Sequence, residues 1–360
     1  MDNKTNLIFI CTKSITFNTF LTSQAKFLEN MGFRIKIACS DIENLRIKKK
    51  QTYKINFPSK FLHLFDIFRY IEIFIQLSNL IKKNKKSIFY LHTPVAAHLF
   101  RIFSFFYNLK IIYFVHGFRF TSDTSYLNSF FYKIIEKVLS IKTKIIITIN
   151  SEDYNYAKSN LLKKVPVYKL KGVGLNLKKN NKLKVKRKIN KILVIAVYKK
   201  SKGYVELLKL AEIIKDKNIK IDCFGYGNYK KFQHIKNKKG LKNISFNNFD
   251  TNLRRKIKYY DLMLHLSKRE GLPVSVMECL SEGLPVICNK IRGNIDLIRD
   301  KHNGFFINSY TEVPKIINLL NIDLKKFNKM RFNAVKSISN DFSNKKINQK
   351  LFKILKKNIK

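Results

Sequence analysis

The sequence has few cysteines, glycines and prolines, and it has no long apolar run. Its five cysteines include no C-x-x-C pair, which excludes a disulfide framework or a zinc ribbon and favours a reducing compartment. No apolar run approaches the roughly 18 residues of a membrane span, and the run near the start is too short for a signal-peptide core. With 45% hydrophobic residues among 360, the chain is not wholly disordered. We expect a cytosolic, globular protein of two domains.

Acidic residues are also scarce, because 24 Asp and Glu face 72 Lys and Arg, giving a net charge of +48. The excess is spread over the chain, with 30 basic and 10 acidic residues in 1–180 and 42 and 14 in 181–360. No zinc finger, basic zipper or RNA-binding aromatic signature accompanies it, so we expect no nucleic-acid partner. A basic surface also attracts anionic lipid. Residues 61–86 are interpreted as a core-facing helix, with a membrane-surface helix as the alternative.

Short β-rich apolar runs alternate with helical segments along both halves of the chain. The expected strands are residues 7–11, 34–38, 88–91, 111–115, 145–149, 167–170, 192–196, 219–224, 244–246, 261–266 and 286–288. The expected helices are residues 19–31, 67–83, 96–107, 126–140, 204–214, 273–282 and 344–357. Such alternation predicts an α/β fold with parallel sheets covered by helices on both faces.

A polar, Lys-rich stretch at 173–190 lacks periodicity and is interpreted as a linker. The predicted domains are residues 1–172 and 191–338. Residues 339–360 form a C-terminal helix that is expected to pack back on the first domain. Doubly wound units bind ligands at the carboxyl ends of their strands, so candidate residues are sought there.

The most informative stretch is residues 264–304. A buried strand ends in a polar turn, Glu270 and Gly271 follow, Pro273 stands where a helix would begin, and Glu278 lies inside that helix. Two carboxylates so placed suit the hydroxyls of a sugar and a ribose; the alternative is two solvent-facing side chains. The apolar neighbours of Glu278 favour a buried carboxylate that needs a partner.

The start of this helix is a candidate anion site. Amides at a helix N-terminus point away from the helix and favour a negatively charged ligand such as a diphosphate. The amides expected to contribute are those of Leu272, Val274 and Ser275.

These residues resemble a known family. Glu270-Gly-Leu-Pro-x4-Glu278 is similar to the Glu-x7-Glu signature of the retaining GT-B glycosyltransferases of family 4, in its capsule and exopolysaccharide branch. Further matches are Glu-Gly-Leu-Pro-Val-Ile at 282–287, Arg-Gly-Asn at 292–294, Asn-Gly-Phe-Phe at 303–306, Leu-His-Thr-Pro-Val at 91–95, Tyr-Phe-Val-His-Gly-Phe at 113–118, residues 147–154 and Gly-Val-Gly at 172–174. The resemblance implies a GT-B fold: an N-terminal Rossmann-like acceptor domain and a C-terminal Rossmann-like nucleotide-sugar domain, facing a central cleft.

The resemblance also implies roles for particular residues. Glu270 would contact the hydroxyls of the donor sugar, and Glu278 those of the ribose. The turn at 271–275 would hold the sugar and the diphosphate through its amides. Lys202, in a Lys-Gly pair, would contact the diphosphate, and His116 would face the donor across the cleft.

One position departs from the family pattern. The family usually has Arg five residues before the lysine of the Lys-Gly pair, whereas Val197 stands there in this sequence. Lys199 or Lys200 could supply the charge, although neither offers a guanidinium fork. Gly225 fits the glycine turn of the family, and a plain βα turn is the alternative.

The implied reaction transfers a sugar, with retention, from a UDP-hexose or UDP-N-acetylhexosamine to a polyprenyl-diphosphate-linked or glycan acceptor in cell-surface polysaccharide synthesis. No Asp-x-Asp pair follows a strand, and the nearest approach, Asp41 and Glu43, is interpreted as a polar loop, so no metal or other cofactor is expected. The expected location is the cytoplasm, peripheral at an anionic membrane surface. The alternatives are a non-transferring GT-B enzyme such as a nucleotide-sugar epimerase, and a basic protein that binds nucleic acid or anionic surfaces.

Overall fold

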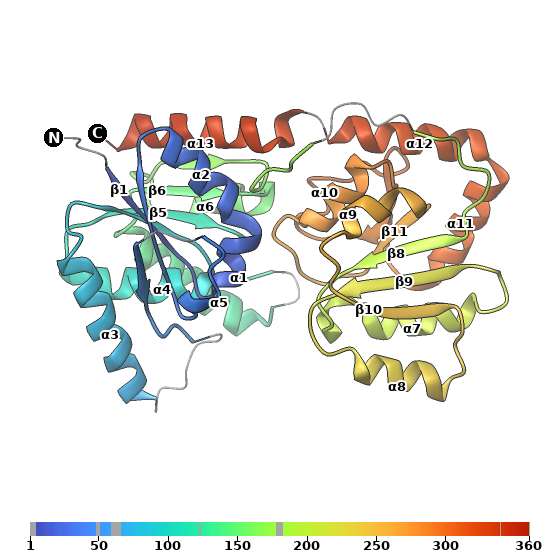
Figure 1. Cartoon of the computed structure of the whole chain (residues 1–360), viewed down its shortest axis with the longest axis horizontal. Coiled ribbons are helices and arrows are strands. Elements are labelled where there is room, and N and C mark those ends of the chain that lie inside the picture. Colours follow the sequence, from blue (N-terminus) through green and yellow to red (C-terminus); the bar gives the residue numbers. More distant parts are fainter. Residues whose placement is uncertain are drawn as a thin grey trace. The chain divides into compact units, whose positions relative to one another are not determined.

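The computed structural model describes residues 5–47, 51–58, 66–121, 124–177, 183–338 and 340–359 (Figure 1). The chain divides into two compact units: the first is Met1–Gly174 together with Asn344–Lys360, and the second is Leu175–Ser343. Each unit contains one parallel sheet with helices around it, which confirms the predicted α/β class.

The first unit contains a seven-stranded sheet of order β3-β2-β1-β4-β5-β6-β7, in which every neighbouring pair is parallel. The central strands consist of Ile, Phe, Tyr, Val and Leu almost without interruption, as expected of strands buried on both faces. The strands are β1 (Asn6–Ile10), β2 (Arg34–Cys39), β3 (Gln51–Lys54), β4 (Ile88–Leu91), β5 (Lys110–Val115), β6 (Ile145–Thr148) and β7 (Val167–Lys169).

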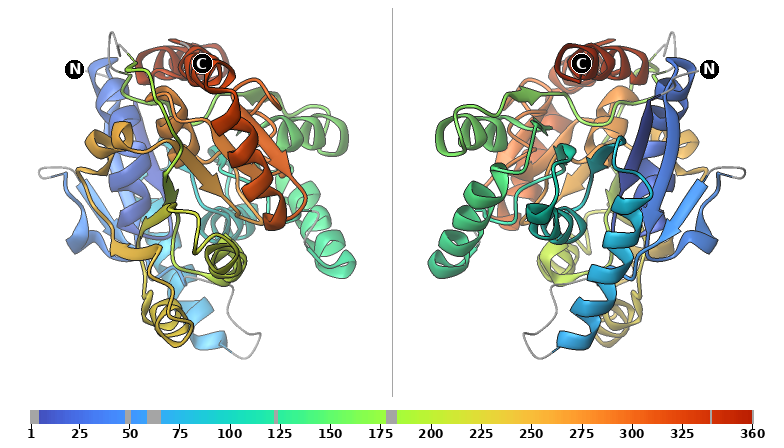
Figure 2. Two further views of the ribbon diagram at one scale, coloured as in Figure 1. Left: turned by 90° about the vertical axis from the view of Figure 1, so that its right-hand side faces the viewer. Right: turned by 90° about the vertical axis from the view of Figure 1, so that its left-hand side faces the viewer.

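Helices cover both faces of this sheet. On one face α3, α4 and α5 lie side by side, and α3 and α4 pack on the side chains of β1, β4 and β5 (Figure 2). On the other face the turn that precedes α2 packs on β1, where the rings of Phe17 and Phe9 meet edge to face. The helices are α1 (Ser14–Thr16), α2 (Thr22–Asn30), α3 (Ile67–Lys82), α4 (Pro94–Phe103), α5 (Tyr126–Ser140), α6 (Ser151–Asn160) and α13 (Asn344–Asn358).

The second unit repeats the arrangement with a six-stranded parallel sheet of order β10-β9-β8-β11-β12-β13. The order reverses between β8 and β11, which is where doubly wound sheets bind ligands. The strands are β8 (Lys191–Ile195), β9 (Lys220–Gly225), β10 (Ile244–Asn248), β11 (Leu262–His265), β12 (Val286–Asn289) and β13 (Gly304–Ile307). The helices are α7 (Tyr204–Ile213), α8 (Lys230–Lys238), α9 (Leu253–Lys256), α10 (Val274–Ser281), α11 (Val313–Ile322) and α12 (Leu324–Ser337).

The expected linker and the expected C-terminal helix each belong to one of the two units over their described residues. The backbone amide of Lys186 donates to Asn328, and that of Ile189 donates to Asn321, so residues 183–190 are bonded to α11 and α12 rather than forming part of a linker. Residues 178–182 lie outside the described part of the chain. At the other end, α13 packs against α2 of the first unit, where the rings of Phe352 and Phe33 meet edge to face.

The expected core-facing helix at 61–86 is α3, and residues 61–65 lie outside the described part of the chain. Its buried side chains are Ile73, Leu77, Leu80 and Ile81. Its exposed apolar side chains are Ile67, Phe68, Ile71 and Ile75. In the parts of the chain that the structure describes, no helix has the length and apolar character needed to span a bilayer.

Candidate active site

Two loops of the second unit meet at the carboxyl ends of β8 and β11, where the strand order reverses. The loop after β8 forms a 3₁₀ turn, Lys200–Lys202, and the loop after β11 carries Glu270. The Nζ of Lys202 lies 2.6 Å from Oε1 of Glu270 and also donates a 3.3 Å hydrogen bond to the carbonyl of Arg269. The fold thus joins two predicted site residues that are 68 positions apart in the sequence.

Gly203 allows the lysine turn to approach β11 this closely. Its φ is +81°, a left-handed conformation that glycine adopts without a steric penalty. A Cβ atom at this position would lie 2.4 Å from Cβ of Leu266 and 2.5 Å from its carbonyl oxygen. The backbone therefore requires glycine at position 203, whatever the role of the lysine before it.

Glu270 lies among several hydrogen-bond donors. Nε2 of His265, the last residue of β11, is 3.4 Å from Oε1 of Glu270, and Arg292 donates a 3.0 Å hydrogen bond to the Glu270 carbonyl. Burial raises the pKa of Glu270, but His265 and Lys202 outweigh it and lower that pKa to about 2. Because 18% of the side chain remains exposed, this carboxylate can still accept hydrogen bonds from a ligand.

The turn before α10 is tightly packed from one side. The helix begins at Val274, one residue later than predicted, with Pro273 as its N-cap. Gly293 has a φ of +83°, and a Cβ atom there would lie 2.5 Å from the Gly271 carbonyl oxygen. The first amides of α10 have no acceptor within the helix. Of the predicted turn residues, the buried ones are Leu272 and Pro273, and the half-buried ones are Gly271, Val274 and Ser275.

Glu278 lies on α10, half-buried and near a second acid. Burial raises its pKa; the charge of Arg254, from α9, opposes this shift, and the charge of Glu282 adds to it. The Nε of Arg254 lies 4.0 Å from Oε1 of Glu282, and its Nη2 donates to the carbonyl of Asn176. Among the described residues the structure gives the Glu278 carboxylate no hydrogen bond, so its oxygens are available to a ligand.

The loop after β8 is also fixed by a close glycine contact. A Cβ atom at Gly225, the last residue of β9, would lie 1.9 Å from the carbonyl oxygen of Ala196. Val197 follows and is 38% exposed. Lys199 and Lys200 are exposed, and in the described part of the chain neither side chain contacts Glu270. The charge beside Glu270 therefore comes from Lys202 alone among these lysines.

His116 belongs to the first unit, where it follows β5. Its Nε2 lies 3.0 Å from Nδ1 of His92, which follows the neighbouring strand β4. The ring of His92 is fully buried and stacks on Phe9. Burial lowers the pKa of His116 to about 4; burial and then the charge of His116 lower the pKa of His92 well below its usual value. Both imidazoles are therefore neutral near pH 7.

Three residues of these clusters were not predicted from the sequence: His265, Arg292 and His92. Each lies inside a stretch or motif that was singled out in the sequence, but none was predicted to have a role. The usable signal was position, because His265 ends a buried strand and His92 directly follows one. Arg292 contacts a backbone carbonyl 22 positions away, and its place in the sequence, unlike that of the two histidines, does not indicate this contact.

Comparison with known families accounts for both units. A family model described as glycosyl transferases group 1 matches residues 176–336, and one described as glycosyl transferase 4-like matches residues 10–150. The chain belongs to the glycosyltransferases that combine these two domains. The predicted resemblance is therefore confirmed at the level of the family.

Relatives and solved structures agree with this assignment. A putative glycosyltransferase, EpsD, of Bacillus subtilis is 27% identical over 320 residues, which cover 84% of this chain and 83% of that protein. The UDP-Gal:alpha-D-GlcNAc-diphosphoundecaprenol alpha-1,3-galactosyltransferase of Escherichia coli is 25% identical over 346 residues, or 88% and 87% of the two chains. The crystal structure of Anabaena Alr3699/HepE in complex with UDP and glucose has a TM-score of 0.77 at 16% identity, covering 98% and 100% of the chains. This glycosyltransferase therefore has the GT-B fold.

Within this glycosyltransferase, Lys202 and Glu270 meet in one cluster beside the start of α10. Their roles toward a ligand stay predictions, as does the expected absence of a metal. In the parts of the chain that are described, no three His, Cys, Asp or Glu side chains are grouped so that they could hold a metal ion.

Proposed function

We propose that this glycosyltransferase moves a hexose or N-acetylhexosamine from a UDP-sugar to a lipid-linked sugar diphosphate or a glycan, with retention of the anomeric configuration. The observation that carries the proposal is the Lys202–Glu270 pair at the carboxyl ends of β8 and β11, beside the N-terminus of α10. A cation and free helix amides are suited to a diphosphate, and an ionised carboxylate is suited to sugar hydroxyls.

In this proposal the chain stabilises the charge that develops on the departing diphosphate. Lys202 and the amides of residues 271–275 are in place before reaction, which makes their electrostatic effect larger than that of water. Glu270 orients the donor sugar, and Glu278 accepts hydrogen bonds from the ribose. His116 is neutral and can exchange hydrogen bonds with the donor. Val197, in place of the family's arginine, leaves Lys202 as the main diphosphate cation and weakens donor affinity.

The names of the relatives support the choice of acceptor. The Escherichia coli relative acts, by its name, on a sugar linked to diphosphoundecaprenol, and EpsD is named as a glycosyltransferase. A lipid-linked acceptor must be reached at a membrane, so the proposal includes peripheral association of this chain with an anionic cytoplasmic leaflet and a role in cell-surface polysaccharide synthesis.

Helix α5 supports the membrane part of the proposal. Its exposed apolar side chains recur at helical spacing and continue one residue beyond the helix: Leu127, Phe130, Phe131, Ile134, Val138 and Ile141. Each is between 43% and 68% exposed. The helix also carries two exposed lysines, and its one acid, Glu136, is buried and paired with Arg101. An exposed apolar stripe flanked by cations suits an anionic lipid surface.

The test is a binding screen followed by product analysis. Thermal shifts with UDP-, GDP- and CMP-sugars identify the donor, and we expect UDP-sugars to stabilise the protein. Incubation with an N-acetylglucosamine-diphosphate lipid should then yield a product whose new linkage has the donor's anomeric configuration by NMR. Epimerisation of the UDP-sugar without transfer supports the epimerase instead. Salt-sensitive DNA binding with no response to UDP supports the basic binding protein.

A further inference from the structure

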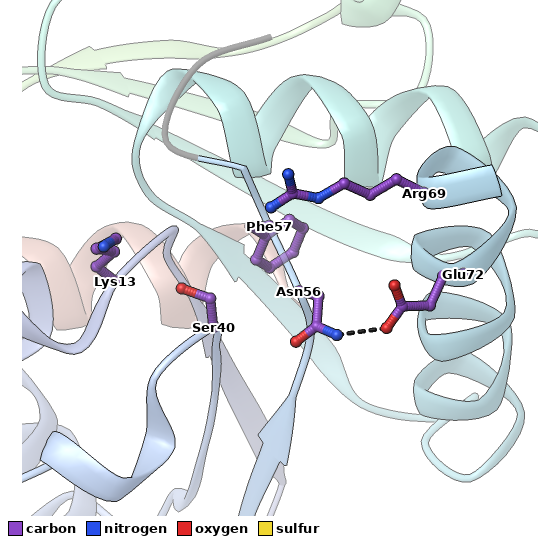
Figure 3. A pocket seen from close by; sticks show the side chains of 6 residues that line it. All are labelled: Lys13, Ser40, Asn56, Phe57, Arg69 and Glu72. Atoms are coloured by element: carbon purple, nitrogen blue, oxygen red, sulfur yellow. Dashed lines mark hydrogen bonds between the residues drawn. The ribbon is translucent and has the colours of Figure 1, made fainter. Parts of the chain in front are cut away.

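The first unit contains a polar pocket that none of the predicted site residues lines. Its volume is about 300 Å³, at the lower end of the range for small-molecule sites. It lies beyond the carboxyl ends of β1, β2 and β3, beside α3. Figure 3 shows Arg69 and Glu72 extending from α3 toward the segment after β3 that carries Asn56 and Phe57. The lining residues are Lys13, Ser40, Asn56, Phe57, Arg69 and Glu72.

The backbone on the strand side of the pocket is held in place. The amide and the hydroxyl of Ser40 both donate to the carbonyl of Thr12, at 3.1 and 2.7 Å. On the other side of Lys13, the amide and hydroxyl of Ser14 donate to the two carboxylate oxygens of Asp41, at 2.7 and 2.9 Å. Lys13 therefore extends from a fixed backbone, although its own side chain is exposed.

A second network fixes the acidic side of the pocket. Asn56 donates its side-chain amide to Oε1 of Glu72, and Gln76 donates to the same oxygen at 2.9 Å. The side-chain oxygen of Gln76 in turn accepts the backbone amide of Asn56, at 2.8 Å. Because the described residues bond only to Oε1, Oε2 of Glu72 can accept a hydrogen bond from a ligand hydroxyl.

The two cations of the pocket are not neutralised. In the described part of the chain, neither the ammonium of Lys13 nor the guanidinium of Arg69 forms an ion pair or a side-chain hydrogen bond, and the carboxylate of Asp41 accepts from Ser14, the residue next to Lys13. Arginine in particular binds phosphate oxygens through two parallel hydrogen bonds. Two free cations beside a fixed carboxylate suit a ligand that has both phosphate and hydroxyl groups.

The surface of α3 indicates what the ligand carries beyond its phosphates. Arg69, Glu72 and Gln76 follow one another at helical spacing and form a polar edge. Phe68, Ile71 and Ile75 precede them by one residue each and form a parallel apolar edge that is 50% to 86% exposed. A chain leaving the pocket across α3 therefore meets an apolar surface.

We propose that this pocket binds the sugar diphosphate head of a lipid-linked acceptor. Arg69 and Lys13 hold the diphosphate, Oε2 of Glu72 and the Ser40 hydroxyl oxygen accept hydrogen bonds from sugar hydroxyls, and the first part of the lipid lies on Phe68, Ile71 and Ile75. This inference rests on the proposed function, because it deepens the description of the acceptor.

The test is direct binding to the whole protein, measured by calorimetry. The probe is N-acetylglucosamine diphosphate carrying an undecyl chain, and its neutral counterpart is undecyl N-acetylglucosaminide. Wild type should bind the diphosphate probe at least about tenfold more tightly, because the neutral probe lacks the charge-assisted hydrogen bonds to Lys13 and Arg69. The Lys13→Gln/Arg69→Gln variant should lose this preference, whereas Lys82→Gln, at the exposed end of the same helix, should keep it.

The outcomes separate this inference from the proposed function. Equal affinity of wild type for the two probes, or an unchanged preference in the double variant, would overturn the pocket assignment even if sugar transfer is observed. UDP-sugar should stabilise the double variant as much as wild type, which shows that the variant is folded and that its donor site is intact. A wild type that binds the probe through the pocket but neither responds to UDP-sugar nor transfers sugar would contradict the proposed function instead.

Discussion

The Nζ of Lys202 lies 2.6 Å from Oε1 of Glu270, and His265 approaches the same oxygen to 3.4 Å. One carboxylate oxygen therefore faces two nitrogen-bearing side chains from the ends of two adjacent strands. This arrangement keeps Glu270 ionised, since these two side chains lower its pKa to about 2 against the effect of burial. It also holds the lysine at the start of α10, where a diphosphate would place its charge.

The glycine after Lys202 gives a prediction about stability. Gly203→Ala should destabilise the protein by about 2–5 kcal/mol, because the left-handed turn costs about 1–2 kcal/mol and the new Cβ overpacks Leu266 at a further cost of about 1–3 kcal/mol. Gly240→Ala is the matched control, with a φ of +60° but no atom within 4 Å of the added Cβ. Chemical unfolding measures both variants. Equal losses in the two would show that the close approach at Gly203 is not needed.

A buried ion cluster links α4, α5 and β5 in the first unit. Glu136 accepts from Arg101 at 2.9 Å and lies 2.7 Å from Nε2 of His98, while the Arg101 guanidinium lies 4.1 Å above the centre of the Tyr113 ring. Glu136→Gln should cost about 3–5 kcal/mol, because it leaves a buried arginine without its counter-ion. The exposed residue Glu152 offers a control, Glu152→Gln, whose unfolding free energy should change by no more than about 0.5 kcal/mol.

The same carboxyl determines how stability depends on acid. Burial raises the pKa of Glu136, but Arg101 and His98 outweigh it and lower the pKa to about 2. The stability that this pair contributes is therefore present above the ordinary pKa of about 4.5 and is lost as the pH falls toward 2. Unfolding curves of wild type and Glu136→Gln should converge over that interval. A difference that stays constant with pH would contradict the assigned charge state.

His116 gives a second prediction about acid, in which folding favours the neutral rather than the charged form of the side chain. The pKa of His116 is about 4 in the folded protein and near 6.5 in the unfolded chain, so folding favours the neutral ring. Its contribution to stability is full above pH 6.5 and declines as the pH falls toward 4. The stability of His116→Gln should therefore depend less on pH over this interval than that of wild type. His234→Gln, at an exposed position, should behave like wild type.

Helix α5 gives a prediction about membrane binding. Phe130→Ser/Ile134→Ser should reduce the fraction of protein that floats with vesicles of anionic phospholipid by about tenfold, since each lost apolar contact costs about 1–3 kcal/mol. The same changes should not alter the thermal shift with UDP-sugar. Ile322→Ser removes an apolar side chain that is 79% exposed on the second unit and should leave flotation unchanged. Equal flotation of all three proteins would exclude α5 as the lipid contact.

The sequence predicted the strands best where nearly every residue of the strand is buried. Strands β4, β5 and β6 are runs of Ile, Phe, Tyr and Val, so their positions were predicted to within a residue. Strand β3 was missed because Gln51–Lys54 is an edge strand with half of its residues exposed and no apolar run. Helix α6 was missed because SEDYNYAKSN has only two buried residues and no apolar stripe.

In the candidate site, too, single residues were predicted but contacts between distant segments were not. The position after a predicted strand led to Glu270, whereas Lys202 and His116 were implied by the resemblance to the family. The meeting of Lys202 with Glu270 depends on the order of β8 and β11, which no local pattern specifies. The pocket beside α3 depends on three strand ends and one helix edge, none of which has a motif.

The most direct test of the account is calorimetric titration of the UDP-sugar selected by the screen into wild type, Lys202→Met, Glu270→Gln and the control Lys268→Met. Lys268 is exposed and pairs with Glu206, so its loss should leave the dissociation constant unchanged. We expect Lys202→Met to weaken binding at least about tenfold and Glu270→Gln to abolish detectable transfer while the protein stays folded. Wild-type affinity and transfer rate in both site variants would contradict the claim that this cluster holds the donor.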